Sequence, residues 1–319
     1  MTVDSPGPAA PPPARGSGER GGRPAQPKRI LIGIAGPLAL IGVVAYVIAS
    51  HSGDLSKAAA RADAGTLVLV TALGLVTLVA RTEAVVLCLA AMGNRPHRRE
   101  IHAANSITFV AMTVNHYVAS PVRAALLKRT DRERAPTIPQ MIMVDTSTTL
   151  IEAALVAIVI IASAGTLKLA WWAAAAIAAA TIGAIAVLLA LRARFSEHPA
   201  LQGLAVLAHS RRRLLVASLM AVVIGCQIVR TFVVLHVAGL HPSLLQACAT
   251  FVAAGVLSSL FAGPSAGAAG APLLVFGHRS LGAAGAAGLI LSITALVSAI
   301  VYAAVGAPVY LRGARRAAR

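Results

Sequence analysis

The stretch from Ile101 to Arg134, IHAANSITFVAMTVNHYVASPVRAALLKRTDRER, is an apolar segment that is broken in its middle and followed by charge. It begins as a mostly apolar helical run, is interrupted at His116, Ser120 and Pro121, and ends in a strongly basic run. Further arginines precede it at positions 95, 98 and 99. The path of this segment therefore decides on which side two basic clusters lie.

The rest of the chain is apolar enough to indicate the class of protein. Of its 319 residues, 57% are hydrophobic, and the mean hydropathy is +0.78. Several apolar runs reach the roughly 20 residues that a helix needs to cross a bilayer. These runs are continuous and rich in Ala, Leu and Val, whereas barrel strands alternate. The sequence therefore predicts an all-α, polytopic membrane protein.

The apolar runs differ in whether they are continuous or broken. Six are continuous and predicted to span: Ile30–Ser50, Gly65–Gly93, Gln140–Gly165, Leu167–Leu191, Leu214–Leu240 and Ser280–Leu311. Two are broken, Ile101–Leu127 and Leu244–Gly277, the second at GPSAGAAGAP. Broken backbone is tolerated in a membrane only where it faces protein or a water-filled cavity.

The distribution of basic residues distinguishes spanning from re-entrant segments. If both broken runs are re-entrant hairpins, most loop arginines and lysines lie inside the cell, as the positive-inside bias requires. If both span, the basic residues divide almost evenly between the two sides. We therefore predict six spanning helices and two re-entrant helical hairpins. A spanning path for residues 244–277 alone keeps a bias and stays an alternative.

The remaining composition indicates location and partners. Residues 1–29 are dominated by Pro, Gly and Arg and are predicted to be a disordered cytoplasmic tail. Residues 30–319 form one membrane domain in the cell membrane, with both termini cytoplasmic. The net charge of +17 fits loops that lie against anionic lipid better than nucleic-acid binding. The three cysteines lie in apolar runs and indicate neither a disulfide nor a metal site. We expect no cofactor and no enzymatic activity, and the sequence specifies no protein partner.

A weak internal repeat connects the two broken runs. Arg81-Thr precedes the break at Pro121 by 40 residues, and Arg230-Thr precedes the break at Pro264 by 34 residues. In the predicted topology the two arginine helices run in opposite directions. Half-repeats of about residues 65–134 and 214–280 therefore predict an inverted repeat, an architecture of many transporters.

Six charged residues fall within the predicted membrane segments: Arg81, Arg123, Arg230, Glu83, Asp145 and Glu152. Each costs at least about 2.5–3.5 kcal/mol at a helix centre, so such residues usually face a protein interior or a polar pathway. Asp145 and Glu152 are seven residues apart and share one helix face. The acids can pair with arginines to hold helices together. Alternatively, one or more guanidinium groups can bind an anionic substrate such as a phosphate.

The predicted substrate-binding set combines these charges with two polar residues at the first break. Asn115 and His116 would lie at the hairpin tip. His116 can relay protons, because imidazole titrates near neutral pH, or can make a structural hydrogen bond. The full set is Arg81, Arg123, Arg230, Asn115, His116, Asp145 and Glu152.

These motifs resemble a known family. The run is Arg81…Gly93…Asn115…Pro121-Val-Arg-Ala-Ala-Leu-Leu-Lys-Arg. It resembles the first half of the flippase-like transmembrane domain of lysylphosphatidylglycerol synthases and its stand-alone relatives. Pro264-Ser-Ala-Gly-Ala-Ala-Gly is similar to the Pro-x-x-x-Gly-x-Gly signature of the second half. The resemblance covers roughly Leu55 to Leu311.

The resemblance implies that the protein moves phospholipids or polyprenyl-linked lipids across the cytoplasmic membrane, with anionic lipids as partners. Aminoacyl transfer is not expected, because the synthetase domain is missing from this sequence. Two other functions remain alternatives: a permease for a small soluble anion, and a non-transporting membrane scaffold for cell-envelope enzymes.

Overall fold

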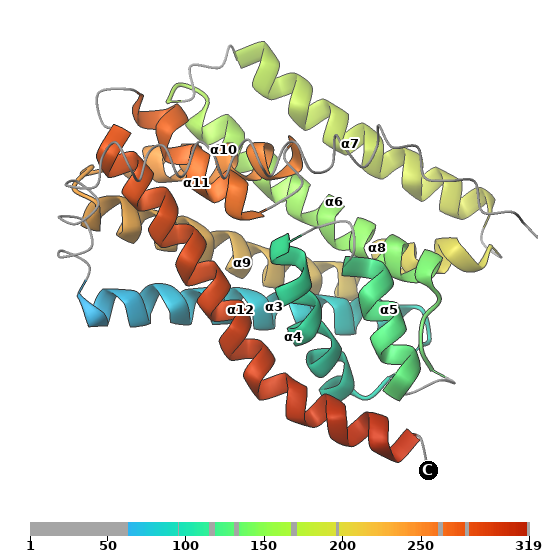
Figure 1. Cartoon of the computed structure of the whole chain (residues 1–319). Helices are drawn as coiled ribbons and strands as arrows, with labels where there is room; N and C mark the ends of the chain where they lie inside the picture. The colour runs from blue at the N-terminus through green and yellow to red at the C-terminus, as the bar shows by residue number, and fades with distance from the viewer. Residues whose placement is uncertain are drawn as a thin grey trace, which may run out of the picture.

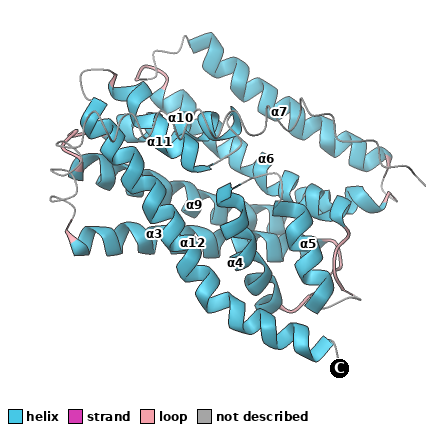
Figure 2. Cartoon of the chain, viewed as in Figure 1, coloured by secondary structure: helices cyan, strands magenta, loops and turns pink. Residues whose placement is uncertain are grey.

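The computed structural model describes residues 63–94, 96–114, 119–130, 134–166, 171–195, 198–260, 264–277 and 281–317. Within these ranges all regular structure is helical (Figures 1 and 2). The predicted tail and the first predicted span, Ile30–Ser50, lie outside the described residues, as do Asn115 and His116.

Five described helices are long and apolar enough to cross a membrane. They comprise Ala64–Ala91, Ile138–Ser163, Ala175–Arg194, Ser210–Val237 and Leu281–Arg315. Their positions coincide with five of the six spans predicted from hydropathy. The described chain is therefore an all-helical protein with the helix lengths of a multi-pass membrane protein.

The first half of the fold places two short helices between two long ones. The order is α3 (Ala64–Ala91), α4 (Arg98–Val114), α5 (Ala119–Thr130) and α6 (Ile138–Ser163). At 17 and 12 residues, α4 and α5 are each shorter than a span, and they pack against each other. The predicted segment is thus divided into two helices, but Ser120 and Pro121, predicted to interrupt it, lie in the first turn of α5, where a proline is tolerated because its missing N–H has no helical partner there.

Local signals set the ends of these helices. The carboxylate of Asp63 accepts a hydrogen bond from the backbone N–H of Thr66 and caps the start of α3. Two residues after α3 ends, Gly93 has φ +87°, the left-handed conformation that glycine adopts without strain. Thr137 and Gln140 form a reciprocal capping box at the start of α6.

The second half repeats the same succession of elements. Its order is α9 (Ser210–Val237), α10 (Leu244–Leu260), α11 (Pro264–Phe276) and α12 (Leu281–Ala317). Gly239, with φ +84°, follows α9 as Gly93 follows α3. From Pro264 onward the Gly-rich run predicted to break the helix is itself helical in α11, and it serves close packing, because a Cβ on Gly267 would overlap the backbone of α10. Between the halves lie α7 (Trp171–Arg194), the 3-10 helix η2 (Pro199–Leu204) and α8 (Ala205–Ala208).

The long helices α3 and α9 pack against each other in opposite directions (Figure 1). Near the start of α9, Arg212 donates a hydrogen bond of 2.8 Å to the carbonyl of Ala90 at the end of α3. At the opposite end, Val70 of α3 shares a buried cluster with Val234 and Leu235 of α9. The contacts around this pair also correspond between the halves, since α12 packs on α3 and α4 while α6 packs on α9 and α10.

One apolar core holds the first half against α9. Its buried side chains come from α3, α4, α5, α6, η2, α8 and α9 and include Leu89, Ile101, Leu127, Met141 and Met220. By contrast, α7 lies at the edge of the bundle beside α6, and none of its apolar window is buried (Figure 1). The core therefore fixes the helices that carry the predicted arginines and acids.

Candidate functional site

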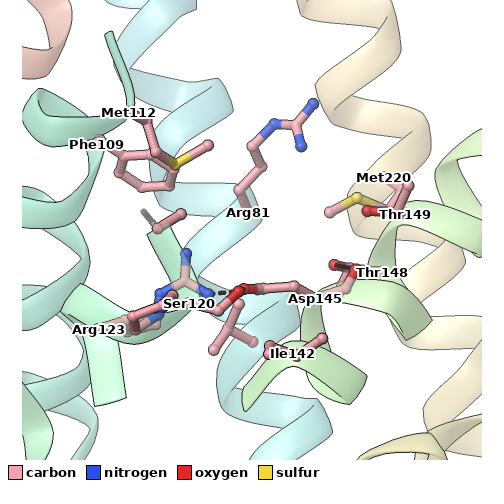
Figure 3. Close-up of a pocket in the computed structure, with 13 residues that line it drawn as sticks. Arg81, Phe109, Met112, Ser120, Arg123, Ile142, Asp145, Thr148, Thr149 and Met220 are labelled. Atoms are coloured by element: carbon pink, nitrogen blue, oxygen red, sulfur yellow. Dashed lines mark hydrogen bonds and ion pairs between the residues drawn. The ribbon is translucent and has the colours of Figure 1, made fainter. Parts of the chain in front are cut away.

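A cavity of about 320 Å³ lies between α3, α4, α5, α6 and α9 (Figure 3). Its polar lining consists of Arg81, Ser120, Arg123, Asp145, Thr148 and Thr149. Its apolar lining consists of Val85, Phe109, Met112, Ala119, Pro121, Ile142 and Met220. Three of the predicted binding residues, from three different helices, therefore meet at one cavity.

The first ion pair at this cavity joins α5 to α6. The Nη1 atom of Arg123 donates to Oδ1 of Asp145, and the hydroxyl of Ser120 donates to Oδ2 of the same carboxylate (Figure 3). The Arg123 side chain is only 4% exposed, whereas Asp145 is 27% exposed. The Nε–H of Arg123 is buried and has no acceptor among the described residues. Arg123 therefore retains an unused donor.

The second ion pair joins α3 to α6. The Nη1 atom of Arg81 donates to Oε2 of Glu152 at 2.9 Å, and Nη2 donates to Oε1, so the contact is bidentate. The side chains are 36% and 20% exposed. Asp145 and Glu152, seven residues apart on α6, thus each bind an arginine of a different helix. The sequence allowed two interpretations of these charges, pairing between acids and arginines or binding of an anionic substrate, and this contact is the first of them.

Arg230 lies away from the cavity. It is 5% exposed on α9 and faces α12, where Nη2 donates to the carbonyl of Leu291 and, at 2.7 Å, to Oγ1 of Thr294. Within the described residues no carboxylate lies within ion-pair distance of it, and its Nε–H has no acceptor. The structure therefore does not bring Arg230 together with Arg81 and Arg123, because its helix presents it to α12 of its own half of the fold.

The cavity combines charge with an apolar wall. Each arginine is neutralised by one carboxylate, so an anion that enters must share or replace a carboxylate as hydrogen-bond acceptor. The hydroxyls of Thr148 and Thr149 add polar groups on the same helix as Asp145, and Phe109 and Met112 form an apolar side (Figure 3). Such a lining suits a small molecule with an anionic end and an apolar end.

Some of the residues that line the cavity were not among the predicted binding residues. Ser120 was interpreted only as part of the break, but its hydroxyl orients Asp145. Thr148 and Thr149 follow Asp145 by about one helical turn, and that spacing is a signal that could have added them to the set. Phe109 carries no such signal, because an aromatic residue in an apolar helix is usually a packing residue.

Comparisons of the chain with protein-family models, with curated proteins and with solved structures gave no match.

Proposed function

We propose that this protein is a flippase-like integral membrane protein that moves or handles a phospholipid or polyprenyl-linked lipid across the cell membrane. The observation that carries the proposal is the cavity that two arginines and an apolar wall share. Guanidinium groups bind phosphate oxygens through parallel N–H donors, and a low-dielectric site strengthens that contact.

The size and lining of the cavity support an amphiphile. At about 320 Å³ it lies at the lower end of ligand pockets, which suits a lipid headgroup and excludes two acyl chains. In this proposal the phosphate exchanges with the carboxylates as acceptor for Arg81 and Arg123. Asp145 and Glu152 hold the guanidinium groups in place when no lipid is bound. The acyl chains stay in the bilayer outside the helices.

The proposed architecture has six spans, two re-entrant hairpins formed by α4–α5 and α10–α11, and an inverted repeat. Its support is the shared succession of elements in α3–α6 and α9–α12 and the opposite directions of α3 and α9. The arginine in each half also binds the last long helix of its own half, Arg81 to Glu152 and Arg230 to Thr294. Inverted repeats of this kind place substrate sites between broken helices near the midplane.

Labelling from one side of the membrane tests the first hairpin. Arg129, exposed at the end of α5, is changed to Cys in a chain whose native cysteines are replaced. A hairpin returns this position to the cytoplasm, so we expect an impermeant maleimide to label it only in inverted vesicles. A cysteine at Ser243, in the loop after α9, is the matched position expected on the outer side. Labelling of position 129 in whole cells would refute the hairpin.

Reconstitution tests the function. The purified protein is placed in liposomes that carry a trace of a fluorescent anionic phospholipid in both leaflets, and dithionite then bleaches the outer leaflet. We expect bleaching to proceed beyond half of the fluorescence, because lipid from the inner leaflet reaches the outer one. Bleaching that stops at half for several anionic lipids would contradict the proposal. Uptake of radiolabelled phosphate or sulfate in the same vesicles would then favour a small-anion permease.

A further inference from the structure

A second polar network lies outside the cavity and joins α3, α4 and α12. Oε1 of Glu83 accepts hydrogen bonds from Arg98, at 2.8 Å from Nε, and lies 2.6 Å from Nε2 of His102. On the other side of the imidazole, Nδ1 lies 2.6 Å from the hydroxyl of Tyr302. The Tyr302 hydroxyl is in turn 3.1 Å from Oγ1 of Thr82. This network is a continuous chain from an exposed arginine to a buried threonine.

The number of hydrogens in this chain can be counted. The hydroxyl of Thr82 donates to the carbonyl of Leu78 at 2.9 Å. Thr82 must then accept from Tyr302, and Tyr302, having used its one hydrogen, must accept from Nδ1–H of His102. Glu83, which already accepts from Arg98, is ionised and accepts from Nε2–H. Both ring nitrogens therefore carry hydrogen, and in this arrangement His102 is a cation.

A second arrangement satisfies the same atoms with one proton fewer. If Nδ1 is bare, Tyr302 rotates its hydroxyl to donate to Nδ1, and Thr82 rotates to donate to Tyr302. Nε2–H still binds Glu83. In this neutral arrangement the hydrogen bond from Thr82 to Leu78 is lost. The positive charge of the imidazole beside the carboxylate of Glu83 is lost as well. The cationic arrangement is therefore favoured by one hydrogen bond and one ion pair.

We propose that His102 is a proton-binding site that controls the junction between α4 and α12. The groups that face its ring are Glu83 from α3, Tyr302 from α12 and, through Glu83, Arg98 of its own helix. Both ring nitrogens are engaged by these partners. The side chain of His102 is 24% exposed and that of Arg98 is 68% exposed, so the site is open to the surroundings at this end of the helices.

The network also touches the wall of the cavity. The rings of Tyr302 and Phe109 lie 6.1 Å apart between centroids, and Phe109 lines the cavity. Rotation of the Tyr302 hydroxyl on loss of the proton changes the bonds that hold Tyr302 between α4 and α3. Proton binding at His102 thereby regulates the cavity, and this last step rests on the proposed lipid function, whereas the proton site does not.

The proton site is tested by thermal unfolding in detergent between about pH 5.5 and 8, the range in which histidine changes charge. The folded chain holds the proton with an extra hydrogen bond, so unfolding releases it and stability falls as the pH rises. We expect this slope in the wild type and in His209→Gln, a control histidine that binds a backbone carbonyl. We expect His102→Gln to lose it. Equal slopes in wild type and His102→Gln would overturn the proposal.

Tyr302→Phe provides a second, milder variant that keeps the ring against Phe109. Without the Tyr302 hydroxyl, the Nδ1–H donor of the cationic ring has no acceptor. The bare Nδ1 of the neutral ring loses only a neutral hydrogen bond, which costs less. We expect the midpoint of the pH profile to move to lower pH, because the protonated ring loses a hydrogen-bond acceptor. An unchanged or higher midpoint would contradict the hydrogen count. If His102→Gln does not fold, this variant decides the question.

The coupling is tested with the liposome assay at different internal and external pH values. We expect the scrambling rate of the wild type to change with pH and that of His102→Gln to be nearly constant. Scrambling that depends on pH equally in both proteins would refute the coupling. Absence of scrambling at every pH would instead refute the lipid function, and the unfolding profile would still report on the proton site.

Discussion

Replacing Arg123 by Met is expected to lower the free energy of unfolding by about 3–5 kcal/mol, the usual cost of removing one partner of a buried ion pair. The Arg123 guanidinium is 4% exposed and holds the carboxylate of Asp145 between α5 and α6. Without it the carboxylate keeps only the hydroxyl of Ser120. Thermal or denaturant-induced unfolding in detergent measures the change.

A matched exposed arginine on the same helix provides the control for this variant. Arg129→Met on α5 is expected to change stability by less than about 0.5 kcal/mol, as is usual for surface substitutions. The double variant Arg123→Met with Asp145→Leu removes the unpaired charge and is expected to recover much of the loss. If Arg123→Met costs no more than Arg129→Met, the ion pair is solvated and contributes little.

Replacing Arg81 by Gln is expected to slow lipid scrambling by about tenfold to a hundredfold. In the proposed function the change removes a charged donor to the lipid phosphate, a contact of about 1.5–3 kcal/mol. Arg81 is the better position for a functional test, because its side chain is 36% exposed and its loss should disturb folding less than that of Arg123. The liposome assay, with protein content and melting temperature matched, measures the rate.

Two further arginine variants show whether the effect is specific. Arg81→Lys keeps the charge and loses the planar fork, so we expect an intermediate rate. Arg211→Gln removes an exposed charge from α9, away from the cavity lining, and should leave the rate unchanged. Equal rates for wild type and Arg81→Gln would show that Arg81 takes no part in the proposed lipid movement.

Much of the fold could be predicted from the sequence because hydropathy acts locally. Continuous apolar runs became the five long helices, and the broken run is divided into two short helices, although Ser120 and Pro121 lie within the first turn of α5 and not between the two. The seven-residue spacing of Asp145 and Glu152 placed both acids toward arginines, since helical periodicity alone fixes which residues share a face. These features needed no knowledge of tertiary packing.

The remaining features depend on which helices meet. Arg81 and Arg230 occupy similar sequence contexts, yet one lines the cavity and the other faces Thr294 of α12. His102 and Tyr302 are 200 residues apart, so no local pattern could connect them. Glu83 is near Arg81 in sequence but binds His102 and Arg98 instead, because residues two apart on a helix point in different directions.

The exposed helix α7 is expected to respond to the thickness of the bilayer. Its apolar stretch of 20 residues is about 30 Å long, close to the hydrocarbon depth of a typical membrane, and none of its residues is fully buried by other helices. A thicker or thinner bilayer therefore acts on α7 directly, through its tilt. Because α7 packs against α6, which carries both Asp145 and Glu152, we expect a change in lipid chain length to reach the helix that positions the two arginines.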